Sequence, residues 1–153
     1  MQCIAPVSVQ LGCYPVSNGK QNAKFVRKLL RDGAKNSIKV GLVLLDREFF
    51  SVGVIHQLKQ KQLKFLMPAV KTPGIKKAIL QHVDGNRKSV SEYRIHSGSG
   101  HIESFNLVIM PSLNPRASNI EERYIVFATN IAPREISKNI EEIPSQYKRR
   151  WGY

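Results

Sequence analysis

The stretch IKVGLVLLDREFFSVGVIHQLKQKQLKFLMPAV, residues 38–70, determines the fold that the sequence predicts. It begins with an apolar run at 38–45, the pattern of a strand buried on both faces, and it ends with a second strand pattern at 63–70. Between them Ser51 can cap a helix over 51–62, whose apolar residues recur at helical spacing: Val54, Ile55 and Leu58. This order predicts a βαβ unit with parallel strands and a right-handed crossover.

Upstream of this unit the sequence predicts a strand and an amphipathic helix. Residues 5–17 alternate loosely and are rich in β-forming residues, and a turn follows at 17–19. From residue 20 to about residue 34, apolar residues recur every three or four positions and basic residues occupy most of the other face. We expect this helix to end near Gly33.

Downstream, a short helix is predicted from Thr72 to about Val83, and the pattern then changes. Residues 84–131 contain alternating segments that predict antiparallel strands: KSVSEYRIHSG, HIESFNLVIMPSL and ERYIVFATN. The Ser-Gly-Ser-Gly sequence at 97–100 suits a hairpin. Residues 133–153 are predicted to be helical, with a break at Pro144 and a fresh start at the next residue.

The chain carries a large excess of positive charge. Lys and Arg number 24 against 11 Asp and Glu, a formal net charge of +13, and the basic residues are spread along the chain. The hydrophobic content of 42% is ordinary for a globular protein. A folded domain of this charge attracts phosphate backbones, so we expect a nucleic-acid partner; the alternative is a basic domain that is merely soluble.

No pattern in the sequence predicts secretion or a membrane span. Cys3 and Cys13 lack metal-ligand spacing, which favours reduced thiols in the cytoplasm. The start MQCIAPVSVQ is not a signal peptide, and the longest apolar run, Val40–Leu45, is too short to span a bilayer. No pairing among the histidines predicts a metal site, and each is expected at the surface or a core edge: His56, His82, His96 and His101.

Asp46 is the first candidate for chemistry. It directly follows the predicted strand at 38–45, where open α/β sheets place their ligands, and its carboxylate can hold a divalent cation. The alternative is a solvated carboxylate paired with Arg47, or one that caps a helix.

The segment YKRRWGY, residues 147–153, is the second candidate. Tyr147 and Arg150 lie three positions apart, so both can face one side of a helix. Cationic side chains with aromatic rings between them suit a DNA backbone or an unstacked base. The candidates for DNA binding are therefore Tyr147, Lys148, Arg149, Arg150 and Trp151. A charged amphipathic helix without a ligand is the alternative.

Both segments resemble DDE transposases of bacterial and archaeal insertion sequences. LLDREFFSVGVIHQLKQKQLKFLMPAVK is similar to the family's second-Asp region, where a strand ends in Asp-Arg and an aromatic residue, a helix and a strand follow. YKRRWGY is similar to the family's Tyr-x-x-Arg-x-x-x-Glu motif, with Tyr147 and Arg150 at the matching positions. The two segments occur in the family's order, and the resemblance covers roughly residues 5–153.

The resemblance implies a single α/β domain over 1–153 with a partial RNase H-like core. Residues 5–83 would form part of this core, 84–131 a β-rich antiparallel insertion, and 133–153 a C-terminal helical segment. Asp46 matches the second of three carboxylates that in the family hold Mg²⁺ or Mn²⁺ for phosphodiester transfer. The implied partners are DNA at transposon ends and a full-length transposase or a second copy, in the cytoplasm at the nucleoid.

Two departures from the family's pattern lead us to expect no strand cleavage by this chain alone. The motif's Glu would follow Tyr153, and the only Asp before Asp46 is Asp32, which falls in a predicted helix. One carboxylate supplies too few oxygen ligands for a pair of Mg²⁺ ions. The family also places its first strand beside the strand that matches 38–45. Without it, we expect an exposed apolar edge and marginal stability.

Two other functions stay open. A truncated transposase can be a non-catalytic regulator that occupies transposon ends or joins full-length subunits, although no helix-turn-helix pattern for sequence-specific binding occurs. A basic RNA-binding α/β domain is the other possibility, but the sequence has no RNP-like aromatic pattern.

Overall fold

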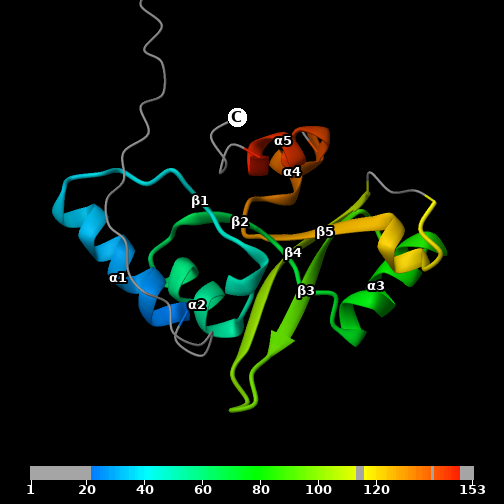
Figure 1. Cartoon of the computed structure of the whole chain (residues 1–153), viewed down its shortest axis with the longest axis horizontal. Helices are drawn as coiled ribbons and strands as arrows, with labels where there is room; N and C mark the ends of the chain where they lie inside the picture. Colours follow the sequence, from blue (N-terminus) through cyan, green and yellow to red (C-terminus); the bar gives the residue numbers. More distant parts are fainter. Residues whose placement is uncertain (1–21, 113–115, 139, 149–153) are drawn as a thin grey trace, which may run out of the picture.

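A mixed sheet forms the centre of the structure (Figure 1). The structure is a computed structural model that describes residues 22–112, 116–138 and 140–148, so the predicted strand at 5–17 lies outside the described residues. Within them the sheet has five strands, in the order β1 (Leu42–Leu44), β2 (Lys64–Pro68), β5 (Tyr124–Thr129), β4 (Ile102–Pro111) and β3 (Val90–His96). The first pair is parallel and the others are antiparallel. The predicted α/β class is therefore confirmed.

β1 and β2 form the parallel pair that the sequence predicts, with Leu42 opposite Lys64. The connection between them runs through the 3-10 helix η2 (Arg47–Phe49) and the helix α2 (Val52–Gln60). The Ser51 side chain caps α2 as predicted, which fixes where this helix begins.

β1 differs from its prediction in length and in burial. It covers three residues rather than the range 38–45, and all three are half-buried. The expectation of a strand buried on both faces is wrong, because β1 lies at the edge of the sheet and, among the described residues, pairs only with β2. Ile38, just before the strand, is 39% exposed. Among the described residues, the apolar strand β1 therefore lies at an edge of the sheet, as the sequence predicts.

The antiparallel strands predicted within 84–131 are confirmed. β3 and β4 form the hairpin, and β4 pairs with β5 along the whole length of β5. β5 also pairs with β2, where the buried Thr129 hydroxyl donates a hydrogen bond to the Phe65 carbonyl (2.5 Å). β5 thus joins the hairpin to the βαβ unit in one sheet.

Three helices cover one face of the sheet: α1 (Asn22–Lys35), α2 and α3 (Pro73–Val83). α2 and α3 pack on the strands, and α1 packs against α2. The core between them includes, from the strands, Phe65, Met67, Leu107 and Ile109, and from the helices Val54, Ile55, Leu58, Ile75 and Ile79. The predicted apolar side of α2 is therefore confirmed as core.

Two short helices cover the other face: α4 (Pro133–Lys138) and α5 (Ile143–Lys148). Along each strand, residues that alternate with those of the first core point to this second face and pack against α4 and α5. The sheet is therefore covered on both faces (Figure 1). This second core is formed by Leu66, Val108, Met110, Phe127, Ile136 and Ile143. None of the helices in the described ranges combines the length and the apolar character that a membrane crossing needs.

One predicted helix end agrees with the structure and one predicted break does not. α1 ends at Lys35, close to the predicted end near residue 34, and stops before Ser37, which adopts a positive φ of 57°, a conformation that ends a helix. Near the C-terminus the break falls before Ile143 rather than at Pro144, which lies in the first turn of α5. Proline is tolerated there because the first backbone N–H groups of a helix have no partner within the helix.

Candidate functional site

Asp46 lies at the carboxyl edge of the parallel strand pair. The preceding residue still pairs with β2, since the Leu45 N–H donates to the Leu66 carbonyl (3.2 Å). The chain then enters η2, where the Phe49 N–H donates to the Asp46 carbonyl (3.0 Å). The Asp46 side chain makes no capping hydrogen bond to η2 and is half-buried. Helix capping therefore does not account for this carboxylate.

Tyr147 reaches Asp46 from the other end of the chain. Its hydroxyl donates a hydrogen bond to Asp46 Oδ1 (3.2 Å), although 101 residues separate the two. The Tyr147 ring packs edge-on against Phe127 of β5, with 5.5 Å between ring centroids. The second core therefore positions the ring, and the hydroxyl extends to the strand edge. The two segments that the sequence singled out meet at this point.

The structure leaves the remaining predicted DNA-binding residues unplaced. Lys148 is the last residue of α5, and its side chain lies outside what the structure describes. Arg149, Arg150 and Trp151 lie outside the described residues as well.

Two grooves adjoin the segment that carries Asp46. The smaller has a volume of about 380 Å³ and includes Arg47, Lys71 and Glu122 in its lining. Lys71 Nζ donates to the Glu121 carbonyl (2.7 Å), and burial lowers the pKa of Lys71 while Glu122 and Glu121 oppose that shift. This groove therefore holds charged groups of both signs beside the Asp46 segment.

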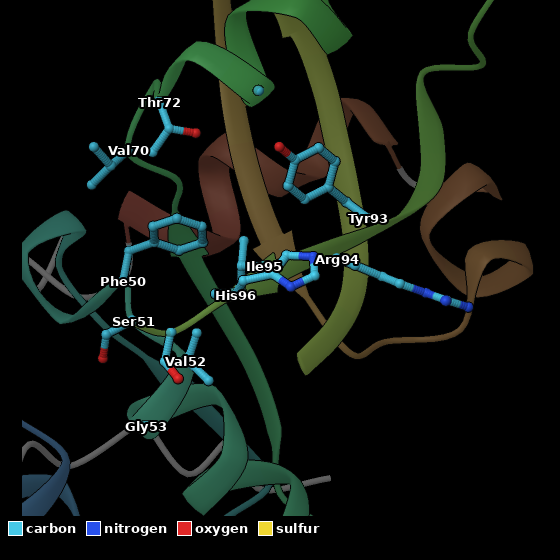
Figure 2. A pocket seen from close by; sticks show the side chains of 12 residues that line it. Phe50, Ser51, Val52, Gly53, Val70, Thr72, Tyr93, Arg94, Ile95 and His96 are labelled. Carbon is cyan, nitrogen blue, oxygen red and sulfur yellow. The ribbon is translucent and has the colours of Figure 1, made fainter. Parts of the chain in front are cut away.

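The larger groove has a volume of about 640 Å³ and shares Val70 with the smaller one. Figure 2 shows Phe50 and Tyr93 on opposite sides of it, with the Arg94 side chain directed away. Both rings pack against Phe105 at centroid distances of 5.7 Å. The groove is predominantly apolar, so it offers packing surface rather than charged groups for catalysis.

A third groove is strongly basic. It has a volume of about 530 Å³ and lies along α1 and the end of α2, lined by Lys24, Arg27, Lys28, Arg31, Ala34 and Lys61. Helical spacing places Lys24, Arg27, Lys28 and Arg31 on one face of α1, as the sequence predicts, and Lys61 comes from the end of α2. Such a row of positive charge suits a phosphate backbone.

One cluster of potential metal ligands was missed from the sequence. Among the described residues, His56, His101 and Glu103 form the one group of three such side chains whose ligand atoms all lie within 4.8 Å of one another. The expectation that no pairing of histidines resembles a metal site is therefore wrong for His56 and His101, although both lie near the surface as expected. Asp46 does not belong to this group. Its carboxylate is a donor that suits Mg²⁺, but the described residues do not surround it with a three-ligand set.

Glu103 is the centre of this cluster and is only 8% exposed. Its Oε2 accepts a hydrogen bond from Lys59 Nζ (2.9 Å), while Oε1 faces both imidazoles. Burial alone would raise the pKa of the Glu103 carboxyl, but the hydrogen bonds from Lys59, His56 and His101 outweigh burial and lower the pKa to about 2. The carboxylate is therefore ionised at neutral pH.

Comparison with models of known protein families gives no match, and a search of curated proteins finds none with significant similarity.

Proposed function

We propose that this chain is part of the catalytic domain of a DDE-type transposase, with an RNase H-like core, and that it binds DNA. Asp46 would be one of the carboxylates that hold the catalytic Mg²⁺ or Mn²⁺. The observation that carries this proposal is the hydrogen bond from Tyr147 to Asp46, because it joins the two segments on which the resemblance rests.

The position of Asp46 gives independent support. It follows β1 of a parallel pair, and the carboxyl edge of parallel strands is where α/β sheets bind ligands. The Tyr147 hydroxyl donates to one oxygen of this half-buried carboxylate. Each carboxylate oxygen can accept more than one partner, so this hydrogen bond and a bound cation are chemically compatible. Tyr147 is therefore a positioning residue that fixes the direction of the Asp46 carboxylate.

The metal would supply the chemistry of phosphodiester transfer, by activating water or a 3′-hydroxyl and stabilising the leaving oxygen. Among the described residues, we assign one carboxylate, that of Asp46, to such a site. A Mg²⁺ pair needs more protein carboxylates than that. We therefore expect the isolated chain to bind DNA without cleaving it, and any cleavage to require carboxylates from elsewhere.

The basic groove along α1 is the surface that we assign to DNA. It places Lys24, Arg27, Lys28, Arg31 and Lys61 around one depression, whereas acidic lining is absent from the described part of that groove. Phosphate contacts of this kind give affinity without sequence selectivity and make binding sensitive to salt.

In the part of the chain that the structure describes, β1 has one edge without a paired strand, which favours a related second role. An edge strand with apolar side chains can pair with another chain, so this protein can also join full-length transposase subunits as a non-catalytic regulator. In that case the chain should inhibit transposition by an active relative that it co-purifies with, and it should do so in the Asp46→Ala variant as well.

A nicking assay tests the role of Asp46. Supercoiled plasmid is incubated with the chain and Mg²⁺ or Mn²⁺, and Asp46→Ala is compared with Asp84→Ala, which removes an exposed carboxylate at the end of α3. We expect no cleavage by any of the three proteins alone. Cleavage that Asp46→Ala abolishes and Asp84→Ala leaves intact would support the transposase role and overturn the expected inactivity.

A binding assay tests the DNA surface. Affinity for duplex DNA should fall as salt rises, and replacing Arg27 and Arg31 with Ala should reduce the slope of log K against log salt by about 2. The matched control replaces Arg134 and Lys138 with Ala, two exposed basic residues of α4. Failure to bind DNA at low salt, or an equal loss in the control, would contradict the assignment of the groove.

A further inference from the structure

We propose that His56, His101 and Glu103 bind one Zn²⁺ ion, which fastens the tip of the β3–β4 hairpin to α2. His56 projects from α2, while His101 and Glu103 belong to the start of β4 and its preceding turn. Residues two apart on a strand face the same side, so the hairpin presents His101 and Glu103 together toward α2. This site is separate from Asp46 and does not depend on the proposed function.

Two of the three distances among the ligand atoms fit tetrahedral zinc. Bonds of about 2.05 Å to a tetrahedral Zn²⁺ place neighbouring ligand atoms about 3.3 Å apart. His101 Nε2 lies 3.3 Å from His56 Nδ1 and 3.2 Å from Glu103 Oε1. His56 Nδ1 and Glu103 Oε1 are 2.5 Å apart, so only this third edge must open, by roughly 0.8 Å, to admit the ion.

The orientation of Glu103 leaves one oxygen for a metal. Lys59 Nζ donates to Glu103 Oε2 (2.9 Å) and also to the Ser104 carbonyl (2.9 Å). These two bonds hold the carboxylate by the oxygen that faces away from the imidazoles. Oε1 then points at both imidazoles. Carboxylates that ligate metals are commonly held by such a hydrogen bond to the other oxygen. Lys59 therefore orients the carboxylate through Oε2 and does not contact Oε1, which faces the two imidazoles.

The donor set selects the class of ion. Two imidazole nitrogens and one carboxylate oxygen suit Zn²⁺, whereas Mg²⁺ and Ca²⁺ prefer oxygen donors alone. Three protein ligands leave a fourth position for water. The side chains of His56 and His101 are 34% and 49% exposed, so the ion can enter from solvent.

Metal titration of the full chain tests this site. Zn²⁺ binding is measured by isothermal titration calorimetry, and Co²⁺ is substituted to record the visible absorption of a tetrahedral site. We expect one ion per chain. The double variant His56→Gln, His101→Gln should weaken Zn²⁺ binding by at least about 100-fold, since the loss of an orienting partner alone costs about 10–100-fold. His96→Gln, which removes an exposed histidine of the same hairpin, should bind as the wild type does.

Two results would overturn the proposal. Equal Zn²⁺ affinity in the wild type and the double variant would place binding elsewhere, and thiolate-to-cobalt absorption would identify Cys3 and Cys13 as the ligands. Circular dichroism of the double variant without metal establishes that it is folded. Tm measured with and without Zn²⁺ gives a second test, because Zn²⁺ should raise the Tm only of proteins with the intact site. Asp46→Ala should keep the full stoichiometry, so failure of the zinc site and failure of the transposase role are distinguishable.

Discussion

Removal of the Tyr147 hydroxyl tests the contact between α5 and Asp46 directly. In Tyr147→Phe the ring keeps its packing against Phe127, and the hydrogen bond to Asp46 Oδ1 is lost. Hydrogen bonds to charged groups contribute about 1.5–3 kcal/mol. This one measures 3.2 Å, longer than the roughly 2.5–2.7 Å of a strong bond from hydroxyl to carboxylate, and Asp46 is only half-buried. We therefore expect the free energy of unfolding to fall by about 1 kcal/mol and Tm by about 3 °C.

A double-mutant cycle with Asp46→Ala separates this bond from the other contacts of both residues. The wild type, the two single variants and the double variant are unfolded in urea and followed by far-ultraviolet circular dichroism. Tyr147→Phe should cost about 1 kcal/mol in the wild type and close to nothing in the Asp46→Ala background. Equal losses in the two backgrounds, within about 0.3 kcal/mol, would refute the contact and remove the main support for the proposed function.

Three further predictions concern the free energy of unfolding, measured in urea or as a function of pH. Leu58→Ala should lower the free energy of unfolding by about 3 kcal/mol, because Leu58 is fully buried and its loss leaves a cavity. Leu80 is 40% exposed, so the control Leu80→Ala should change that free energy by less than about 0.5 kcal/mol. Similar losses in the two variants would contradict the assigned core. Thr72→Ala should cost about 1 kcal/mol, because the Thr72 hydroxyl caps α3 by accepting from the Ile75 N–H, and Thr72→Ser should restore most of that stability if capping is the cause. Folding lowers the pKa of Glu103 from 4.5 to about 2, so its contribution is complete above pH 4.5 and is lost as the pH falls toward 2, a change of about 3 kcal/mol. Glu103→Gln should lack this part of the acid-dependent loss, and parallel acid profiles for the two proteins would count against it.

The βαβ unit could be predicted because its information is local. Apolar runs, the cap at Ser51 and helical spacing all lie within residues 38–70. The burial of β1 could not be predicted, since it depends on what lies beside the strand. The position of β5 between β2 and β4 could not be predicted for the same reason. Alternation of apolar and polar residues predicts a strand and its two faces, but not the strands beside it.

The candidate site divides in the same way. Asp46 could be identified from its place after a strand. Its contact with Tyr147, which lies 101 residues away, was not predicted, because no local pattern reports it. His101 and Glu103 carry a local signal, because residues two apart on a predicted strand face one side. His56 lies 45 residues from His101, and only the packing of α2 over β4 brings it to them.

The place of β5 in the sheet also sets an order of assembly. The β3–β4 hairpin and the βαβ unit each rest on contacts between segments close in sequence, so both can form early. Their strands cannot form one sheet until β5 is inserted, because β5 lies between β2 and β4. Thr129 of β5 bonds to Phe65 of β2 although 64 residues separate them. During synthesis, residues 124–129 must therefore leave the ribosome before the sheet closes. Until then one edge of β2 and one edge of β4 stay unpaired, and the speed of that late insertion should determine how much of the chain escapes aggregation.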